Sequence, residues 1–196
     1  MSSRIAGPLV LLVFAAALPS TGRAQGRPDP AAMQAAQREA MQKLAFMDGT
    51  WRGEARTIPP GAPGEKHTLT QTERVGAFLG GTIRVIEGRG YEADGSVGFN
   101  ALGVISYDSA KKTYSMRSWA LGYFGDYPLT PTENGFEWVM RFGSMSQRYT
   151  ATFEDGVWHE VGHRTIGDGD PVQFFEMTLH RIGDTDWPAA GAVPAK

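Results

Sequence analysis

Hairpin signals recur along the chain from residue 50 to residue 181, and they constrain the fold more than any other feature of the sequence. Segments in which apolar and polar side chains alternate, as in strands with one buried face, are separated by short turn sequences. The turns include Asp94-Gly95, Asn134-Gly135 and Asp155-Gly156. Because Asn-Gly and Asp-Gly are the strongest short signals for a two-residue hairpin, this order predicts sequential antiparallel strands.

About ten strands are predicted in this part of the chain. They cover residues 51–57, 67–75, 82–91, 97–107, 113–121, 123–129, 136–142, 145–154, 157–166 and 172–181. Strands joined by consecutive hairpins tend to close on themselves, because closure removes the exposed edges of the sheet. The predicted fold is therefore all-β, an up-and-down antiparallel β-barrel of about ten strands with an N-terminal helix.

The N-terminal residues resemble a secretory signal peptide. Arg4 precedes an apolar run over residues 5–18, and Gly22-Arg23-Ala24 supplies the small residues of a cleavage site. We therefore expect cleavage after Ala24 and export to the periplasm or the exterior. The apolar run has about 14 residues and a spanning helix needs about 20, so no membrane span is predicted. The chain has no Cys, which excludes disulfides and lipid attachment through a Cys.

A helix is predicted between the signal and the barrel. Asp29 is a suitable N-cap and Pro30 a suitable first helical residue, and good helix formers continue to about Met47. The predicted domains are a signal peptide over 1–24, a linker and helix over 25–43, the barrel over 44–183 and a disordered tail over 184–196. The net charge of −2 is mixed along the chain and leaves no basic stripe, so nucleic acid is not a predicted partner.

The sequence His159-Glu160-Val161-Gly162-His163 matches the H-E-x-x-H motif of zinc proteases, which requires a helix. Three observations favour a strand instead. Gly-containing turns flank the segment, it contains β-branched residues and Gly162, and the expected third ligand position holds Gly169. On a strand the two His side chains share a face but lie about 13 Å apart, at about 3.3 Å per residue. The sequence therefore predicts no metal site at this motif.

If Asp155-Gly156 is a two-residue turn, Glu154 pairs with Val157 and the faces of both strands follow. The face richer in aromatic residues is predicted to line the barrel interior. It carries Gln147, Tyr149, Trp158, Glu160 and Arg164, and continued pairing adds Phe175 and Met177. The opposite face, which carries both His side chains, is predicted to face solvent.

Polar residues inside a barrel must be paired or solvated, because an unpaired buried polar group is costly. Glu160, Arg164 and Tyr149 either satisfy one another, bind internal water or contact a polar group of a ligand. Glu73, Arg117 and Trp119 lie in other predicted strands and are further candidates for the cavity wall. No catalytic arrangement and no cofactor are predicted.

A set of short motifs occurs in a familiar order. They are Gly49-Thr50-Trp51-Arg52-Gly53, Glu73 before Gly80-Gly81, Gly103-Val104-Ile105-Ser106-Tyr107-Asp108, Lys112-Thr113-Tyr114, Trp119 and a terminal Arg181. In this order they resemble calycin-type barrels such as lipocalins, fatty-acid-binding proteins and nitrobindin-like proteins. The nearest resemblance is to a bacterial calycin-like family, domain-of-unknown-function family 1579. It covers about residues 44–182 and, since that family has no agreed activity, it implies fold more than function.

The resemblance also carries expectations for single residues. In calycins the opening Trp packs across the barrel base beneath the N-terminal helix, so Trp51 is expected to have this structural role. Nitrobindin-like relatives hold haem through a His near the start of the last strand. Here that strand begins Pro171-Val172-Gln173-Phe174-Phe175 and has no His at this place, so the resemblance does not extend to haem.

Three functions remain open on the sequence alone. The first is binding of a small lipophilic or amphipathic molecule inside an exported barrel. The second is a hydrolase or isomerase that uses Glu160 and Arg164, and the third is a structural protein whose barrel is filled by side chains. A volume for a ligand separates the first two from the third, because ligand pockets are typically about 300–1,000 Å³.

Overall fold

The structure, a computed structural model, describes residues 29–59 and 64–188. Its elements are α1 (Pro30–Gln42), η1 (Ala45–Met47), β1 (Gly49–Thr57), β2 (His67–Phe78), η2 (Leu79–Gly81), β3 (Ile83–Tyr91), β4 (Val97–Asp108), β5 (Thr113–Ala120), β6 (Tyr123–Pro131), β7 (Gly135–Phe142), β8 (Met145–Glu154), β9 (Val157–Ile166) and β10 (Val172–Gly183). The predicted signal peptide and residues 189–196 of the predicted tail lie outside the described residues. No helix in the described part is long and apolar enough to cross a membrane.

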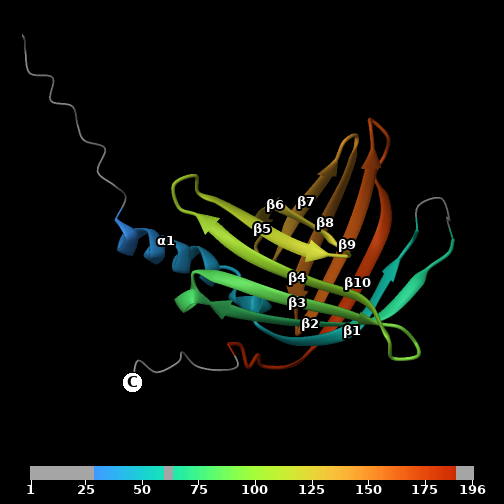
Figure 1. Cartoon of the computed structure of the whole chain (residues 1–196), viewed down its shortest axis with the longest axis horizontal. Helices are drawn as coiled ribbons and strands as arrows, with labels where there is room; N and C mark the ends of the chain where they lie inside the picture. Colours follow the sequence, from blue (N-terminus) through green and yellow to red (C-terminus); the bar gives the residue numbers. More distant parts are fainter. Residues whose placement is uncertain (1–28, 60–63, 189–196) are drawn as a thin grey trace, which may run out of the picture.

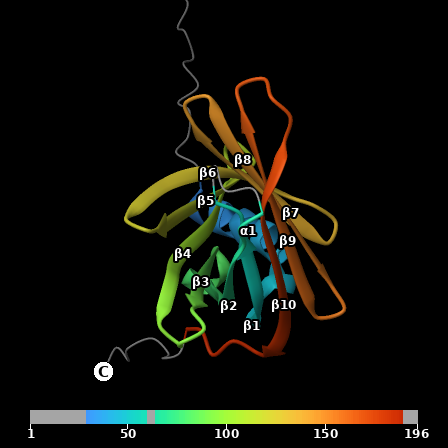
Figure 2. The same ribbon diagram turned by 90° about the vertical axis from the view of Figure 1, so that its right-hand side faces the viewer.

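The strands form one closed sheet. Their order is β1-β10-β9-β8-β7-β6-β5-β4-β3-β2, and β1 pairs antiparallel with both β10 and β2, so the first and last strands close the barrel. Figures 1 and 2 show this sheet curling around, with α1 at one end. The prediction of an all-β, up-and-down barrel of about ten strands with an N-terminal helix is confirmed.

The hairpin turns follow the local chemistry of the sequence. Asp155 and Gly156 have φ values of 49° and 73°, as a type I′ turn requires, and Glu154 pairs with Val157. Leu121 and Gly122 turn in the same way between β5 and β6, with φ values of 52° and 83°. These two-residue turns fix the register of their hairpins, and therefore decide which side chains face inward.

The two ends of the barrel differ. The closed end is the one where α1 and η1 lead into β1, and the open end carries the β3–β4, β5–β6, β7–β8 and β9–β10 turns. Helix α1 begins at Asp29, whose Oδ1 accepts a hydrogen bond from the backbone N–H of Ala31 at 3.0 Å. It ends at Gln42 rather than near Met47, because the chain tightens into η1 before it enters β1. The helix predicted to continue to about residue 47 is therefore too long.

Apolar packing seals the closed end. Met41, Leu44 and Met47 are at most 1% exposed and belong to the same core as the inner side chains of the strands. Trp51 donates from Nε1 to the Met47 carbonyl at 2.9 Å and packs edge-on against Trp158, with ring centroids 5.9 Å apart. The position expected for Trp51, across the barrel base beneath the N-terminal segment, is therefore confirmed.

A buried ion pair also ties the N-terminal segment to the barrel. Arg84, on β3, is 3% exposed and donates from Nε and Nη2 to the two carboxylate oxygens of Asp48 at 2.7 and 2.8 Å. Its Nη1 also donates to the Met41 carbonyl. One guanidinium therefore holds both the end of α1 and the start of β1 against the sheet.

The chain after β10 does not leave the barrel at once. Trp187 packs edge-on against Phe78 of β2 with ring centroids 5.5 Å apart, and Arg74 lies over the Trp187 ring at 5.5 Å. Arg74 also pairs with Asp186 at 3.2 Å. Residues 184–188, predicted to belong to a disordered tail, therefore lie against β2.

Candidate functional site

The interior divides into two layers. Inner side chains near the closed end are almost completely buried, for example Val75, Ile105 and Leu179 at 0%. Inner side chains nearer the open end keep accessible surface although they point into the barrel, including Tyr127, Trp138, Gln147, Tyr149 and Phe175. The half of the interior near the open end, called the upper interior below, is therefore the part of the barrel that solvent reaches.

One side of the upper interior has little side-chain bulk. Strands β4, β5 and β6 present Ala101, Gly103, Ser118, Ala120 and Gly125 on their inner face. In the strand order β4 lies opposite β9 and β5 lies opposite β10. A wall of small residues therefore faces the strands that carry the predicted polar and aromatic side chains.

Glu160 projects from β9 into this interior and is only 6% exposed. Its Oε1 accepts a hydrogen bond from Trp138 Nε1 at 3.0 Å, across from β7. Burial raises the pKa of Glu160 to about 7, while the Trp138 and Trp158 N–H groups and His159 pull it down. Glu160 therefore holds its proton up to about neutral pH.

Glu73 enters the same interior from β2. Gln71 donates to its Oε1 at 2.7 Å, and the facing residue on β3 is Gly88. A Cβ at Gly88 would lie 2.6 Å from Glu73 Oε1, so this glycine provides the space for the carboxyl group. Burial raises the pKa of Glu73 to about 8; the Gln71 hydrogen bond opposes this, and the negative charges of Glu160 and Glu87 add to it.

An aromatic wall surrounds Glu160. The rings of Trp138 and Tyr149 stack with centroids 4.3 Å apart and an interplanar angle of 9°, and Tyr127 lies 5.8 Å from Trp138. Burial, with the nearby negative charge of Glu160, raises the pKa of Tyr149 above its usual range. The phenol is therefore a neutral donor or acceptor in this wall at any ordinary pH.

An irregularity in β10 adds a second Phe to this wall. The register between β10 and β9 shifts between Gln173 and Phe175, and both Phe174 and Phe175 then lie 5.6 Å from Tyr149. Gly162 makes this crowding possible, because a Cβ there would lie 2.9 Å from Phe175 Cβ and 3.1 Å from atoms of Phe174 and Tyr149. The bulge therefore depends on a glycine in the neighbouring strand.

Two further polar groups face this region. Trp158 is 3% exposed, and its Nε1 has no hydrogen-bond partner within the described residues, although the N–H lies near enough to Glu160 to lower the pKa of that carboxyl. Arg164 lies two inner positions beyond Glu160 toward the open end, and its guanidinium lies over the Phe174 ring at 5.5 Å. Among residues 29–59 and 64–188 no acidic side chain pairs with Arg164, so the alternative in which Glu160 and Arg164 satisfy each other is not realised.

The wall of the barrel is weakly joined between β6 and β7. Only Leu129, Thr130 and Pro131 of β6 pair with β7, so residues 123–128 and 139–142 are not in register with each other. Figure 1 shows β5 running across the molecule while β7 to β10 rise steeply away from it. The sheet therefore has its least hydrogen-bonded seam beside Tyr127 and Trp138.

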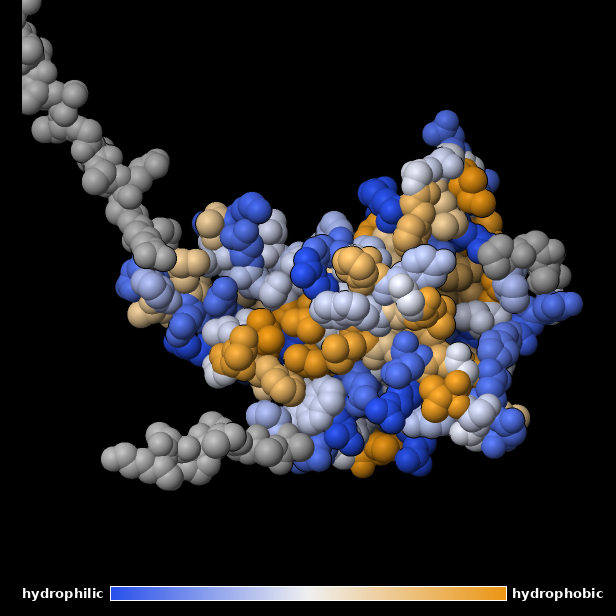
Figure 3. All heavy atoms as spheres, viewed as in Figure 1, coloured by the Kyte–Doolittle hydropathy of each residue, from blue (hydrophilic) through white to orange (hydrophobic). Residues whose placement is uncertain are grey.

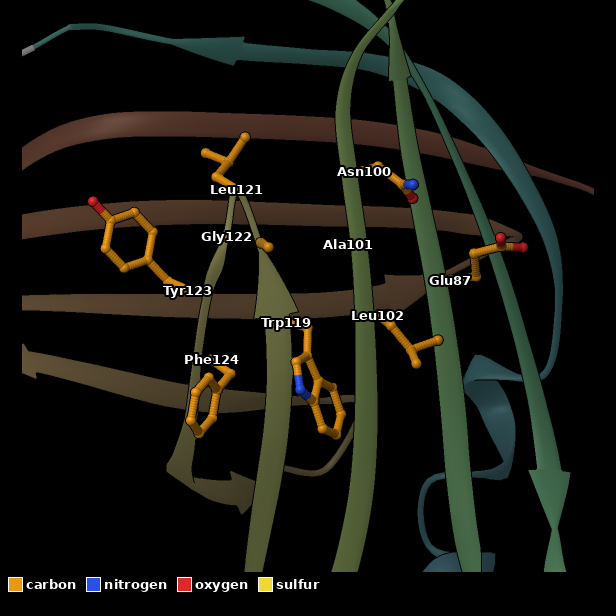
Figure 4. A pocket seen from close by; sticks show the side chains of 10 residues that line it. Glu87, Asn100, Ala101, Leu102, Trp119, Leu121, Gly122, Tyr123 and Phe124 are labelled. Atoms are coloured by element: carbon orange, nitrogen blue, oxygen red, sulfur yellow. The ribbon is translucent and has the colours of Figure 1, made fainter.

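The outer surface carries a separate apolar area near the β5–β6 turn. A surface hollow of about 500 Å³ is lined there by Glu87, Asn100, Ala101, Leu102, Trp119, Ala120, Leu121, Gly122, Tyr123 and Phe124. Figure 4 shows how the exposed side chains of Leu102, Trp119 and Phe124 project from this wall, and Figure 3 shows apolar residues gathered over the face that carries β3 and β4. Leu102, Trp119 and Phe124 face outward here, whereas Ala101 and Ala120 occupy inner positions of the same strands, so the hollow lies at the rim of the barrel beside the β5–β6 turn.

The predicted lining residues separate into two groups. Those on the inner face are Glu73, Gln147, Tyr149, Trp158, Glu160, Arg164, Phe175 and Met177. Arg117 and Trp119 lie on the outer face of β5, where Arg117 forms an exposed ion pair with Asp126 and Trp119 is 40% exposed. Their neighbours Met116 and Ser118 take the inner positions instead, so these two candidates do not line the interior.

Sequence reasoning missed three residues that contact the two carboxyl groups. Trp138 and Gln71 donate the hydrogen bonds to Glu160 and Glu73, and Gly88 provides the space for Glu73. Alternation of Phe136, Trp138 and Met140 on β7 was the available signal for Trp138. No sequence signal relates β7 to the middle of β9, since β8 lies between them.

The H-E-x-x-H segment is a strand. The prediction of an extended segment over residues 157–166 is confirmed, because these residues form β9 and pair with β8 and β10 along their length. His159 and His163 lie on the outer face and are separated by about 13 Å of strand. His159 instead lies 3.5 Å from Glu176 of β10. Within residues 29–59 and 64–188, no three His, Cys, Asp or Glu side chains are grouped as a metal site would need.

Comparisons with known proteins give a likeness in structure alone. No family model matches the sequence, and no curated protein matches it. The crystal structure of Rv2717c from M. tuberculosis superposes with a TM-score of 0.55 at 11% sequence identity, covering 72% of this chain and 96% of that chain. The likeness is one of fold. At this identity it carries no information about activity or ligand.

Proposed function

We propose that this protein binds a small, partly apolar molecule in the upper interior of its barrel. The strongest support for this proposal is the composition of that space. Aromatic rings and two carboxyl groups line one side and small residues line the other; most of these side chains keep accessible surface, while Glu160 is 6% exposed. Ligand sites commonly combine apolar walls with a few convergent polar groups of this kind.

The bonding of the polar groups supports this proposal over a barrel filled by its own side chains. Within the described residues Glu160 receives one hydrogen bond, from Trp138, and Glu73 receives one, from Gln71. A carboxyl group offers more hydrogen-bonding positions than one, and the free position of each group is available to a ligand. A core that had to satisfy only itself would be better served by apolar residues.

The catalytic alternative, a hydrolase or isomerase that uses Glu160 and Arg164, is not favoured. The two side chains do not contact each other, because Glu160 is bonded to Trp138 and the Arg164 guanidinium lies over Phe174. Catalysis by an acid–base pair requires both groups within reach of one reacting atom. We retain binding as the function that the geometry supports best.

Two further parts of the proposal rest on the sequence. We propose that the chain is exported after cleavage behind Ala24, since residues 1–24 have the composition of a signal peptide. We also propose membership of the bacterial calycin-like domain-of-unknown-function family 1579, on the order of the motifs from Gly49 to Arg181. The barrel fold agrees with this assignment without singling it out.

A fluorescence titration with the neutral apolar dye Nile red tests the proposed function. We expect saturable binding to the protein, and a Kd at least about tenfold higher for Ser118→Trp, which fills the small-residue wall from inside. Thr152→Trp, on the outer face of β8, is the matched control and should bind the dye as the wild type does. Absence of saturable binding, or equal affinity of both Trp variants, would contradict the proposal.

A further inference from the structure

The two carboxyl groups of the upper interior form a more specific feature than an apolar pocket needs. Glu160 and Glu73 enter from β9 and β2, with β10 and β1 between these strands, and the charge of Glu160 acts on Glu73. A ligand that was only apolar would gain nothing from two buried acids. The question is which ligand chemistry would use both.

No basic side chain of the described residues contacts the pair. From the neighbouring strands the inner side chains that face the two acids are apolar or neutral, namely Trp51, Gln71, Trp138, Tyr149, Trp158 and Met177. Tyr127 faces them from β6, and Glu87 adds negative charge from the outer face of β3. His159 lies on the outer face of β9 and is the weakest of the influences that lower the pKa of Glu160.

The arginines at inner positions of the described strands are engaged elsewhere. Arg84 pairs with Asp48 at the closed end, and Arg181, opposite Trp51, pairs with Asp184. Arg164 lies four residues beyond Glu160 along β9, about 13 Å toward the open end at about 3.3 Å per residue, and its guanidinium lies over Phe174. The acids therefore have no basic partner among the residues that the structure describes.

A buried donor beside Glu160 is also without a partner. Trp158 Nε1 is enclosed beside Glu160 and has no acceptor within hydrogen-bonding geometry among the described residues, although it lowers the pKa of the Glu160 carboxyl. A buried N–H of this kind is rare in native proteins. A fully ionised Glu160 would attract this N–H, and a cation beside Glu160 is what would keep the carboxylate ionised in this interior.

The aromatic wall suits an organic cation more than a metal ion. Ring faces of Trp and Tyr attract ammonium groups, whereas Ca²⁺ or Mg²⁺ needs about six or more oxygen ligands. Trp138 donates to Glu160, and the rings of Tyr149 and Tyr127 pack against Trp138. Two carboxyl groups with one amide offer too few oxygens for a hard metal ion. Carboxylate and aromatic groups together are the usual recognition set for an amine.

We propose that the ligand of this barrel is an organic amine or quaternary ammonium compound, whose cationic group lies against Glu160 and Glu73 while its apolar part fills the space beside the small-residue wall. This inference rests on the proposed function and adds the charge of the ligand to it. Binding then proceeds with release of protons from the two carboxyl groups, since the cation stabilises their ionised forms. Affinity for the cation accordingly rises as the pH increases from about 6 to about 9.

Three probes of similar size and different charge test the inference. They are phenethylamine (cationic), 2-phenylethanol (neutral) and 3-phenylpropionate (anionic), each titrated calorimetrically into the full chain at about pH 8. We expect phenethylamine to bind at least about tenfold more tightly than the neutral probe, and the anion to bind most weakly. We also expect a binding heat that depends on the ionisation heat of the buffer, which reports the released protons.

Variants at the two acids identify the groups responsible. Glu160→Gln and Glu73→Gln each keep a hydrogen-bonding side chain but cannot become anionic, so the preference for the cationic over the neutral probe should fall in each variant and reach about one when both are combined. Glu154→Gln, at an exposed position at the end of β8, is the control and should keep the wild-type preference. Circular dichroism of each variant confirms that the barrel is folded.

The outcomes separate this inference from the proposed function. If Nile red binds saturably but phenethylamine binds no more tightly than 2-phenylethanol, the amine proposal is wrong and the proposal of small-molecule binding stands. The same holds if 3-phenylpropionate binds most tightly. If neither Nile red nor any of the three probes binds saturably, both proposals fail. A preference for the cation that Glu160→Gln and Glu73→Gln leave intact also overturns the amine proposal.

Discussion

Glu160→Gln should change how the stability of the barrel depends on pH. Glu160 is 6% exposed, and burial raises the pKa of its carboxyl group from 4.5 in the unfolded chain to about 7 in the folded one. The folded state therefore binds this proton more tightly than the unfolded state does. The resulting stabilisation is fully present below about pH 4.5 and is lost as the pH rises through about 7.

The size of the effect follows from the two pKa values. The interval between 4.5 and about 7 corresponds to about 3 kcal/mol of folding free energy, at about 1.4 kcal/mol for each tenfold change in proton affinity. The Gln side chain keeps an oxygen that accepts from Trp138 but does not ionise. At about pH 5 the variant should therefore be within about 1 kcal/mol of the wild type, and at about pH 9 it should be about 3 kcal/mol more stable.

Urea denaturation followed by far-UV circular dichroism at several pH values measures this difference directly. The difference between variant and wild type is the useful quantity, because it cancels the titration of groups that do not interact with Glu160. Glu154→Gln, exposed at the end of β8, is the control and should give a nearly constant difference across the range. Parallel pH profiles for Glu160→Gln and the wild type would refute the reasoning, since the carboxyl group would then ionise in the fold as readily as in water.

Three further substitutions probe the scaffold. Arg84→Met removes the guanidinium that holds Asp48, and should lower the free energy of unfolding by about 3 kcal/mol in urea denaturation; an unchanged midpoint would show that the ion pair is dispensable. Gly162→Ala places a Cβ 2.9 Å from a Phe side chain and should cost about 1–3 kcal/mol, seen as a lower melting temperature, with an equal melting temperature as the contrary result. The double variant His159→Ala, His163→Ala should contain as much zinc as the wild type after dialysis against zinc, because β9 keeps the two rings apart. Equimolar zinc in the wild type but not in the variant would contradict this.

Local sequence determines much of the architecture. The alternation of apolar and polar side chains gives the strands, and turns such as Asp155-Gly156 give the hairpins, because both depend on residues within a few positions of one another. A two-residue turn also fixes the pairing of its flanking strands. For this reason the inward placement of Tyr149, Trp158 and Glu160 followed from the sequence once the turn between β8 and β9 was recognised.

The contacts of the candidate site belong to the tertiary structure. On β5 the outer face carries Arg117 and Trp119 while the inner face has the smaller Ser118 and Ala120, so composition alone points to the wrong face as the core. The orientation of that strand is decided by its pairing with β4 and β6.

The same holds for the groups that surround the carboxyls. Trp138 reaches Glu160 from two strands away, and the bulge that turns Phe174 inward exists because Gly162 leaves room in the neighbouring strand. Helix α1 likewise stops at Gln42 because the chain has to enter β1. Alternation along a strand specifies the face on which a side chain lies. Which side chains meet inside the barrel depends on the register of all ten strands and on the closure of the barrel, and no local segment of the sequence encodes these.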